Sequence, residues 1–160
     1  MESDETVNLA PIENYLNASR IPVRLACTTE AGWPYILSLW YIYLDGAIYC
    51  ATQASARIVT FLRNSPACAY EIASDLPPYC GVRGRARAKI EANRGPEILN
   101  LLLKRYLQNT ASSLAENLLS RSDTEVAIRL EPLSLYAWNF TSRMKDSVPS
   151  GTEKPCPPDI

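Results

Sequence analysis

Histidine is absent from this chain of 160 residues. A Ser-His-Asp triad, a histidine-rich metal site and a histidine-ligated haem are therefore excluded by composition. If the protein is an enzyme, we expect a cofactor to supply the chemistry, with protons drawn from solvent, a carboxylate, a tyrosine or the cofactor itself. The sequence accordingly assigns no catalytic side chain and no metal site.

Long apolar runs and strong net charge are also missing. No apolar run approaches the roughly 20 residues of a transmembrane helix. The net charge of −1 gives no general attraction to nucleic acid or to an anionic membrane. The N-terminal stretch MESDETVNLAP is acidic and polar, unlike a signal peptide. We therefore predict a cytoplasmic protein that binds neither nucleic acid nor a membrane.

The five cysteines are odd in number and form no CxxC pair. Cys27, Cys50 and Cys68 lie within apolar strand patterns, where a small buried thiol is the ordinary explanation. We therefore expect neither a structural zinc site nor a disulfide framework.

The apolar pattern fits one globular domain with a sizeable core. Strands are predicted at residues 23–28, 34–44, 47–52, 67–72, 81–91 and 124–138, and helices at residues 11–17, 55–64 and 95–107, with a shorter helical piece around 112–119. Hairpin-linked strands with inserted helices indicate an α+β fold dominated by antiparallel β-structure, a six-stranded barrel with two or three helices. We expect residues 1–8 to be flexible, residues 9–144 to form the domain and the Pro-rich residues 145–160 to be a disordered tail.

The predicted second strand is apolar on both faces. Odd-numbered residues from Tyr35 to Tyr43 point one way and even-numbered residues from Ile36 to Leu44 the other, with Ser38 between them. Such a strand needs cover on both sides. One side fits a barrel core, and the other fits a partner subunit or a planar ligand. Burial beneath a helix is the alternative.

The strand at residues 81–91 alternates between small inward residues and outward cations, which are Arg83, Arg85, Arg87 and Lys89. The cations are most simply a solvated face or one side of salt bridges across a dimer. Binding of a phosphate or of an acidic substrate is the alternative.

Phosphate chemistry is suggested where the third predicted strand meets the next helix. Asp45 and Gly46 form a hairpin turn ahead of that strand, and Thr52, Ser55 and Arg57 follow where strand changes to helix. A cation in the first turn of a helix is unfavourable by roughly 0.3–1 kcal/mol, and a bound phosphate would reverse the sign. The alternative is that Arg57 pairs with a carboxylate while the two hydroxyls cap the helix.

The run PYILSLWYIYLDGAIYCATQASARIVTFLRNSPACAYEI, followed by GVRGRARAKI, resembles the pyridoxamine-phosphate-oxidase-like flavin-binding split-barrel family. The resemblance covers residues 21–143. It implies a split β-barrel and a homodimer that holds FMN, or in some branches a deazaflavin coenzyme, at the subunit interface.

The resemblance also implies cofactor-binding residues. The isoalloxazine ring would lie beside Ile36, Leu37, Ser38, Leu39 and Trp40, the phosphate would be held by Ala51, Thr52, Ser55 and Arg57, and Trp138 would stack on the flavin or substrate. The arginine-bearing C-terminal segment that binds pyridoxine phosphate in the true oxidases has no match, so vitamin B6 oxidation is not expected.

The function expected from these features is an FMN-dependent oxidoreductase that transfers hydride to or from an unidentified small molecule. A deazaflavin-dependent reductase on the same scaffold is the first alternative. The second is a protein that stores or senses a flavin, haem or other planar ligand without turnover.

Overall fold

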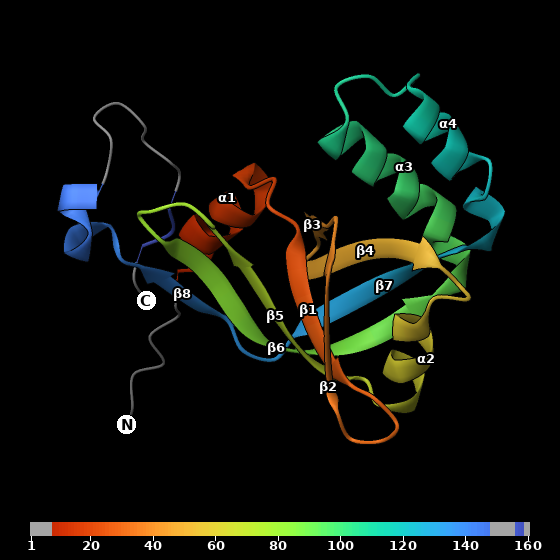
Figure 1. Ribbon diagram of the computed structural model, residues 1–160, viewed down its shortest axis with the longest axis horizontal. Helices are drawn as coiled ribbons and strands as arrows, with labels where there is room; N and C mark the ends of the chain where they lie inside the picture. Colours follow the sequence, from red (N-terminus) through yellow and green to blue (C-terminus); the bar gives the residue numbers. More distant parts are fainter. Residues whose placement is uncertain (1–7, 148–155, 159–160) are drawn as a thin grey trace.

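A single curled antiparallel sheet forms the body of the protein in the computed structural model, which describes residues 8–147 and 156–158 (Figure 1). The strand order is β2-β1-β5-β6-β7-β4-β3, and β8 pairs with β6. The strands are β1 (Val23–Thr28), β2 (Pro34–Leu39), β3 (Ile42–Leu44), β4 (Ala47–Gln53), β5 (Ala67–Ala73), β6 (Cys80–Glu91), β7 (Glu125–Pro132) and β8 (Tyr136–Asn139). The predicted antiparallel α+β barrel is confirmed, although two of its six predicted strands are each divided in two.

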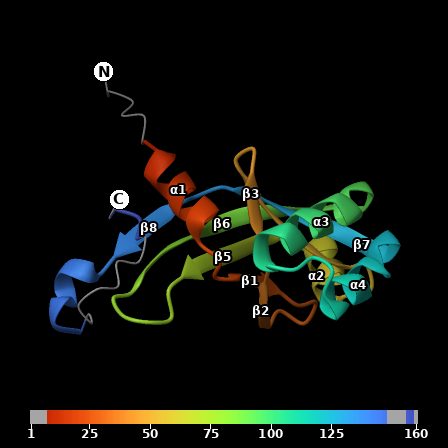
Figure 2. The same cartoon turned by 90° about the horizontal axis from the view of Figure 1, so that it is seen from above.

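Four α-helices accompany the sheet in the described residues, where two or three were expected: α1 (Ala10–Ala18), α2 (Arg57–Asn64), α3 (Gly95–Tyr106) and α4 (Ser113–Leu119). Short 3-10 turns occupy Ala92–Arg94, Ser122–Thr124, Thr141–Arg143 and Lys145–Ser147. Helices α3 and α4 lie together at one side of the sheet, and β8 lies at the opposite end from α2 (Figures 1 and 2).

The two faces of β4 bury different cores. Ile48 and Cys50 point into the main core inside the curled sheet, while Ala47 and Tyr49 point the other way onto Ile98 and the rest of the apolar face of α3. This alternation follows from the two-residue period of a strand. Helix α3 therefore covers the outside of β4 and β7, and no helix of the described residues covers the outside of β1, β2 and β5.

The predicted second strand breaks at Trp40 and Tyr41, which separate β2 from β3. The Trp40 indole stacks on Tyr106 of α3, with ring centroids 5.0 Å apart and planes 6° apart. The Tyr106 hydroxyl accepts a hydrogen bond from the backbone N–H of Tyr41 at 3.3 Å. Tyr41 is fully buried, and its hydroxyl donates to the Leu16 carbonyl at 2.7 Å.

Arg105 joins the same bend to the end of α1. Its guanidinium donates to the carbonyls of Leu16 at 2.9 Å, Asn17 at 2.8 Å and Ser19, which the end of α1 leaves without helical partners. The guanidinium also lies 5.1 Å from the centroid of the Tyr41 ring, and burial raises the pKa of Tyr41 to about 12. Helix α1, helix α3 and the bend are therefore one connected unit.

A disulfide joins Cys80 to Cys156 and corrects the expectation that none would form. The two cysteines are 76 residues apart in sequence, and nothing in the local pattern around Cys156 marks it as a partner of Cys80. Asn139 adds a hydrogen bond to the Pro157 carbonyl at 3.0 Å. Part of the predicted disordered tail is thus held against the domain, while residues 148–155 and 159–160 lie outside the described residues.

The remaining predictions have mixed outcomes. Cys27 and Cys50 are buried free thiols, as expected, and Cys68 is half-buried. The predicted flexible segment 1–8 lies outside the described residues except for Asn8. In the described part of the chain, no helix has both the length and the apolar character needed to cross a bilayer.

Two glycines illustrate different constraints and give a stability prediction. A Cβ on Gly95 would lie 1.9 Å from the Glu125 carbonyl oxygen, so α3 begins in direct contact with β7. Gly46, in the confirmed β3–β4 hairpin, has φ +76° and open space around it.

We expect Gly95→Ala to lower the free energy of unfolding by about 3 kcal/mol through overpacking, and Gly46→Ala by about 1 kcal/mol through backbone strain. Equal losses for the two variants in urea denaturation would contradict this account.

Candidate functional site

The outer face of β2 consists of Pro34, Ile36 and Ser38, all of which are exposed. Ile36 is 67% exposed, and no described helix covers this face. The intervening Leu37 and Leu39 point into the main core, so only their backbone can meet a ligand on the outer face. Burial beneath a helix is therefore wrong for β2.

Burial beneath a helix is correct for the continuation of that strand. Trp40, Ile42 and Leu44 pack against α3. Trp40 already has one ring face covered by Tyr106. Of the five residues predicted to flank a ring, only Ile36 and Ser38 present side chains on the open face of the sheet.

The β4–α2 junction, residues 52–57, carries polar side chains that make no hydrogen bond or ion pair with the described residues. Arg57 is the first residue of α2, and the preceding Ala56 provides no side-chain cap. Within the described residues, the hydroxyls of Thr52 and Ser55 make no hydrogen bond and Arg57 has no carboxylate partner. The alternative of a capped helix and an ion-paired arginine is therefore not realised here. Ala51, the fourth predicted phosphate-site residue, packs toward α3 and α4 instead.

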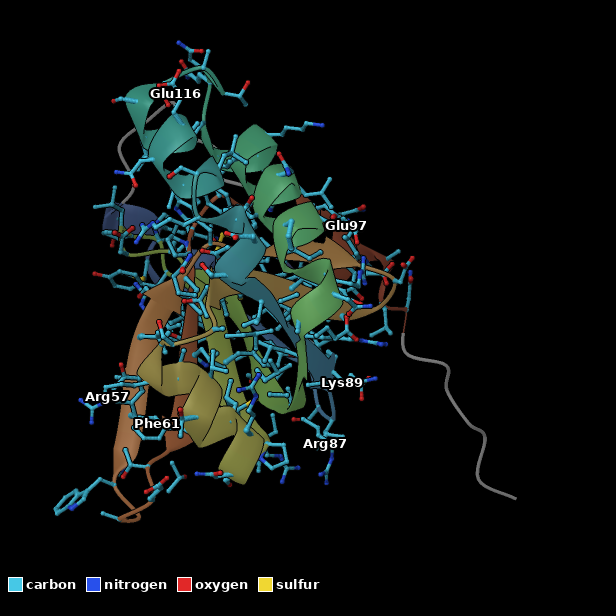
Figure 3. The ribbon with its side chains drawn as sticks, turned by 90° about the vertical axis from the view of Figure 1, so that its right-hand side faces the viewer. Arg57, Phe61, Arg87, Lys89, Glu97 and Glu116 are labelled. Carbon is cyan, nitrogen blue, oxygen red and sulfur yellow. A yellow bond between two sulfur atoms is a disulfide. The ribbon has the colours of Figure 1, made fainter. Side chains whose placement is uncertain are left out.

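Phe61 connects this junction to β2, and sequence reasoning missed it. The Arg57 guanidinium lies 5.6 Å from the centroid of the Phe61 ring (Figure 3). That ring meets Tyr35 of β2 edge-on, with centroids 5.2 Å apart. The i,i+4 spacing of Arg57 and Phe61 was the available signal. These contacts place the junction next to the core-facing side of β2 at Tyr35.

Trp138 lies far in space from the β4–α2 junction. It stands on β8 opposite Gly81 of β6, with its ring 5.0 Å from Phe140. Its indole Nε1 is buried without a hydrogen-bond partner among the described residues. Because β8 and α2 are at opposite ends of the sheet (Figures 1 and 2), one protomer does not bring Trp138 to Arg57.

A buried carboxylate on β7 is hydrogen-bonded to the last residue of β4, next to the β4–α2 junction. Glu125 of β7 is 5% exposed and lies opposite Gln53, the last residue of β4. The Gln53 amide donates a hydrogen bond to the Glu125 carboxylate, and the backbone N–H of Ala54 donates to the Thr124 carbonyl at 2.9 Å. Burial raises the pKa of Glu125 above its ordinary value, although the bond from Gln53 opposes this shift. This carboxylate fixes the start of the turn and does not neutralise Arg57.

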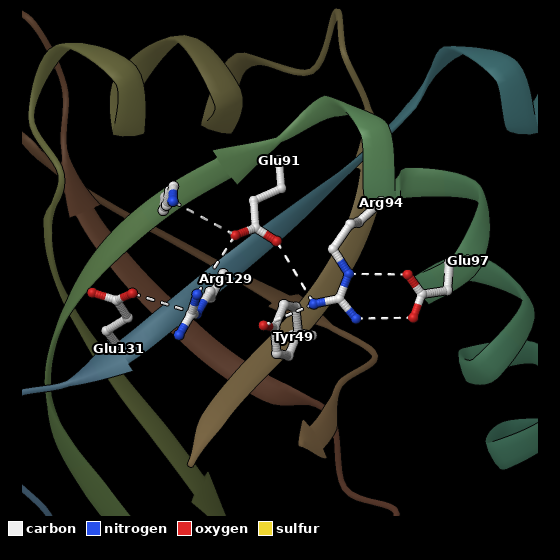
Figure 4. Close-up of polar contacts among 7 residues, drawn as sticks. Tyr49, Glu91, Arg94, Glu97, Arg129 and Glu131 are labelled. Carbon is white, nitrogen blue, oxygen red and sulfur yellow. Dashed lines mark hydrogen bonds and ion pairs between the residues drawn. The ribbon is translucent and has the colours of Figure 1, made fainter. Parts of the chain in front are cut away.

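A second set of charges, where β6 ends and α3 begins, is fully paired (Figure 4). Three cations surround the largely buried carboxylate of Glu91 at 3.7–3.9 Å, namely Lys89, Arg94 and Arg129. Arg94 also forms two hydrogen bonds of 2.9 Å with Glu97, which lower the pKa of that carboxyl. This network joins β6, β7 and α3 and balances three cations with three carboxylates, although Glu91 Oε2 and Arg129 Nε are buried without a hydrogen-bond partner in the described structure.

Comparison with known proteins rests on structure. Neither a family model nor a curated protein matches the sequence. A conserved hypothetical protein from Mycobacterium tuberculosis superposes with a TM-score of 0.71 at 19% identity, covering 96% of each chain. An F420 reductase gives a TM-score of 0.64 at 16% identity, covering 76% of this chain and 94% of the other. An FAD-binding protein from Mesorhizobium loti gives 0.62 at 18%, covering 82% and 94%.

The chain has the split-barrel fold. The resemblance carried by the sequence of β2, β4, α2 and β6 is thereby confirmed at the level of fold. The open outer face of β2 and the β4–α2 junction are the two parts of the candidate site in this split barrel; the Phe61–Tyr35 contact links the junction to the core-facing side of β2, opposite Ile36.

The raised pKa of Glu125 gives a prediction about pH. An acid whose pKa is higher in the folded than in the unfolded state costs stability as pH rises through that interval, because the folded state resists ionisation. We expect Glu125→Gln to be more stable than the unaltered protein at about pH 7, and this advantage to vanish at about pH 3, where the carboxyl is protonated in both states. Thermal unfolding at the two pH values measures this difference. Glu116→Gln, on the exposed side of α4, is the control, and a destabilised Glu125→Gln variant at neutral pH would refute the argument.

Proposed function

We propose that this split barrel binds a flavin-type cofactor, FMN in the first instance, and acts as an oxidoreductase on a small molecule. The observation that carries the proposal is the β4–α2 junction, where Arg57 has no carboxylate partner and two hydroxyls make no hydrogen bond in the described residues, at a helix start without a side-chain cap. A phosphate is the group that such a set satisfies.

The electrostatics of the junction support a dianion. The start of α2 leaves backbone N–H groups without helical acceptors and carries the positive end of the helix dipole. Arg57 adds a full positive charge at the same place, which is unfavourable until an anion arrives. The hydroxyls of Thr52 and Ser55 can donate to the remaining phosphate oxygens.

The open face of β2 supports a planar ring. Ile36 offers apolar surface, and β2 stands at the edge of the sheet with only β1 as neighbour. An edge strand leaves alternate backbone N–H and C=O groups unpaired. These groups suit the hydrogen-bonding rim of an isoalloxazine, and one N–H can serve the flavin N5 without any histidine.

A bound flavin would supply hydride transfer at its ring, so the chain's own residues have only to bind, orient and exclude water. Arg57 and the junction fix one end of the cofactor. Ile36 and the backbone of β2 fix the plane of the ring. No side chain of this region is required to move a proton.

A homodimer with the cofactor at the subunit interface is part of the proposal. Trp33 and Ile36, at the β1–β2 turn and on β2, are 73% and 67% exposed, and a second copy would cover them. Trp138 is distant from the junction of its own chain, so only a partner's cofactor would come within its reach.

A deazaflavin coenzyme is the second candidate, because an F420 reductase is among the proteins of the same fold. It carries a phosphate, so the junction would serve it equally. Titration of the purified protein with FMN and with F420, followed by absorbance, separates the two. A colourless protein that binds neither would refute the proposal, and binding without turnover of reduced nicotinamide and quinones would leave a storage or sensing role.

Arg57→Ala tests the phosphate site. We expect FMN affinity to fall by about 1.5–3 kcal/mol, a rise in Kd of roughly ten- to a hundredfold, because a charge-assisted hydrogen bond is lost. Isothermal titration gives the Kd, and unfolding temperature verifies the fold. Arg63→Ala is the matched control, since Arg63 is exposed in the last turn of the same helix. Unchanged affinity in Arg57→Ala would place the phosphate elsewhere.

A further inference from the structure

We propose that a groove on the outer face of the sheet binds the carboxylate of a small planar acid, with Arg83 and Arg85 as its anion-binding residues. This inference rests on the proposed function, because it names the substrate class that would lie beside the cofactor. The groove has a volume of about 500 Å³ and crosses β2, β1, β5 and β6 toward β8. Three strand spacings of about 4.8 Å give it a length of roughly 14 Å.

Strand register defines the floor of the groove. One row of neighbours across the strands runs from Ile36 through Ala26 and Ala69 to Arg85. Two alanines in the centre leave a flat, shallow shelf, because their side chains end at Cβ. Ile36, which the proposed function places beside the flavin ring, ends the shelf on β2, and Arg85 gives it a cationic end on β6.

The neighbouring row of cross-strand residues contributes most of the charged side chains of the groove. It runs from Arg24 through Glu71 to Arg83. The Arg24 guanidinium is 4.0 Å from the Glu71 carboxylate and donates to the Ala73 carbonyl at 3.3 Å, so Arg24 is already satisfied. Arg83 and Arg85 have no carboxylate partner among the described residues. Glu71 lies directly opposite Arg83, and the three arginines and one carboxylate that line the groove give it a net charge of +2.

The wall at the cationic end is built by close packing. A Cβ on Gly84 would lie 2.0 Å from the Ser134 carbonyl oxygen, so the β7–β8 loop packs directly on this glycine. The Ser134 hydroxyl accepts a hydrogen bond from the backbone N–H of Arg85 at 3.1 Å. The Ser134 carbonyl accepts one from the Tyr70 hydroxyl at 3.2 Å. These contacts hold the β7–β8 loop against the core-facing side of Gly84, and Ser134 of this loop lines the same end of the groove.

Tyr136 completes this wall and positions one cation. The Arg83 guanidinium lies 5.1 Å from the centroid of the Tyr136 ring, a cation–π contact that leaves its N–H groups available. Two neighbouring guanidinium groups above an apolar shelf match a flat apolar body that ends in a carboxylate. The ligand class is therefore an aromatic or similarly planar monocarboxylic acid.

The paired network around Glu91 shows why these arginines differ from others on the surface. There Arg94 and Arg129 are both neutralised by carboxylates (Figure 4). Arg87 offers the better control within the same strand. It follows Arg85 on the same face of β6 and also lacks a carboxylate partner in the described residues, but it does not line the groove.

The test measures binding of 2-naphthoate and of its neutral analogue 2-naphthamide to the full chain by ligand-observed NMR at low ionic strength. We expect 2-naphthoate to bind at least about tenfold more tightly than 2-naphthamide. Arg83→Gln and Arg85→Gln should each weaken 2-naphthoate binding about tenfold, and Arg87→Gln less than about twofold. Equal effects of Arg85→Gln and Arg87→Gln, or equal binding of the two probes, would overturn the inference.

The titrations are repeated with FMN present and in the Arg57→Ala variant, while sedimentation reports the oligomeric state. Arginine-dependent binding of 2-naphthoate by a protein that rejects FMN would support the groove and refute the cofactor proposal. FMN binding without 2-naphthoate binding would refute the groove alone. A groove that fails to bind 2-naphthoate while Arg83→Gln or Arg85→Gln weakens self-association is a subunit interface, which also overturns the inference.

Discussion

The stacking of Trp40 on Tyr106 is the interaction on which the surface of this split barrel depends. It ends β2 and turns the chain into β3, so that α3 covers the continuation but not β2 itself. Arg105 and Tyr41 secure the same point to α1 through hydrogen bonds to its last carbonyls. One apolar segment of sequence thereby provides both a covered strand, which stabilises the barrel, and an open edge strand, which is available to a ligand or a partner.

Arginines in this protein fall into two groups that sequence composition does not separate. Those at the β6–α3 end, such as Arg94, are neutralised by carboxylates and aromatic faces. Arg57 at the junction and Arg85 on the outer sheet form no ion pair among the described residues, whereas Arg24 on the same outer face pairs with Glu71. An arginine without an ion-pair partner beside an apolar surface or a helix start indicates a site for an anionic ligand. The guanidinium charge itself is not stabilised by either neighbour.

Local patterns were sufficient to predict much of the fold. Asp45 and Gly46 adopt positive φ in the β3–β4 hairpin, and the alternation along β6 places its arginines outward, as expected from their residue types and period. Pro132 ends β7, which divides the last predicted strand. The break at Trp40 could not be predicted, because its cause is a ring contributed by α3 more than sixty residues later. Two other features could not be predicted for the same reason: the position of Glu125 next to the junction, and the packing of the β7–β8 loop on Gly84. Both depend on tertiary contacts that leave no periodic pattern in the sequence.

The Cys80–Cys156 bond has a topological consequence. It closes a covalent ring that contains β6, α3, α4, β7 and β8, and thus both the network around Glu91 and the arginine-bearing side of the outer sheet. A protease that cut one peptide bond within this ring would leave the fragments attached to each other. Helix α2 and the edge strand β2 lie outside this covalent ring, so after a single cut between them no cross-link would join the β4–α2 junction to β2.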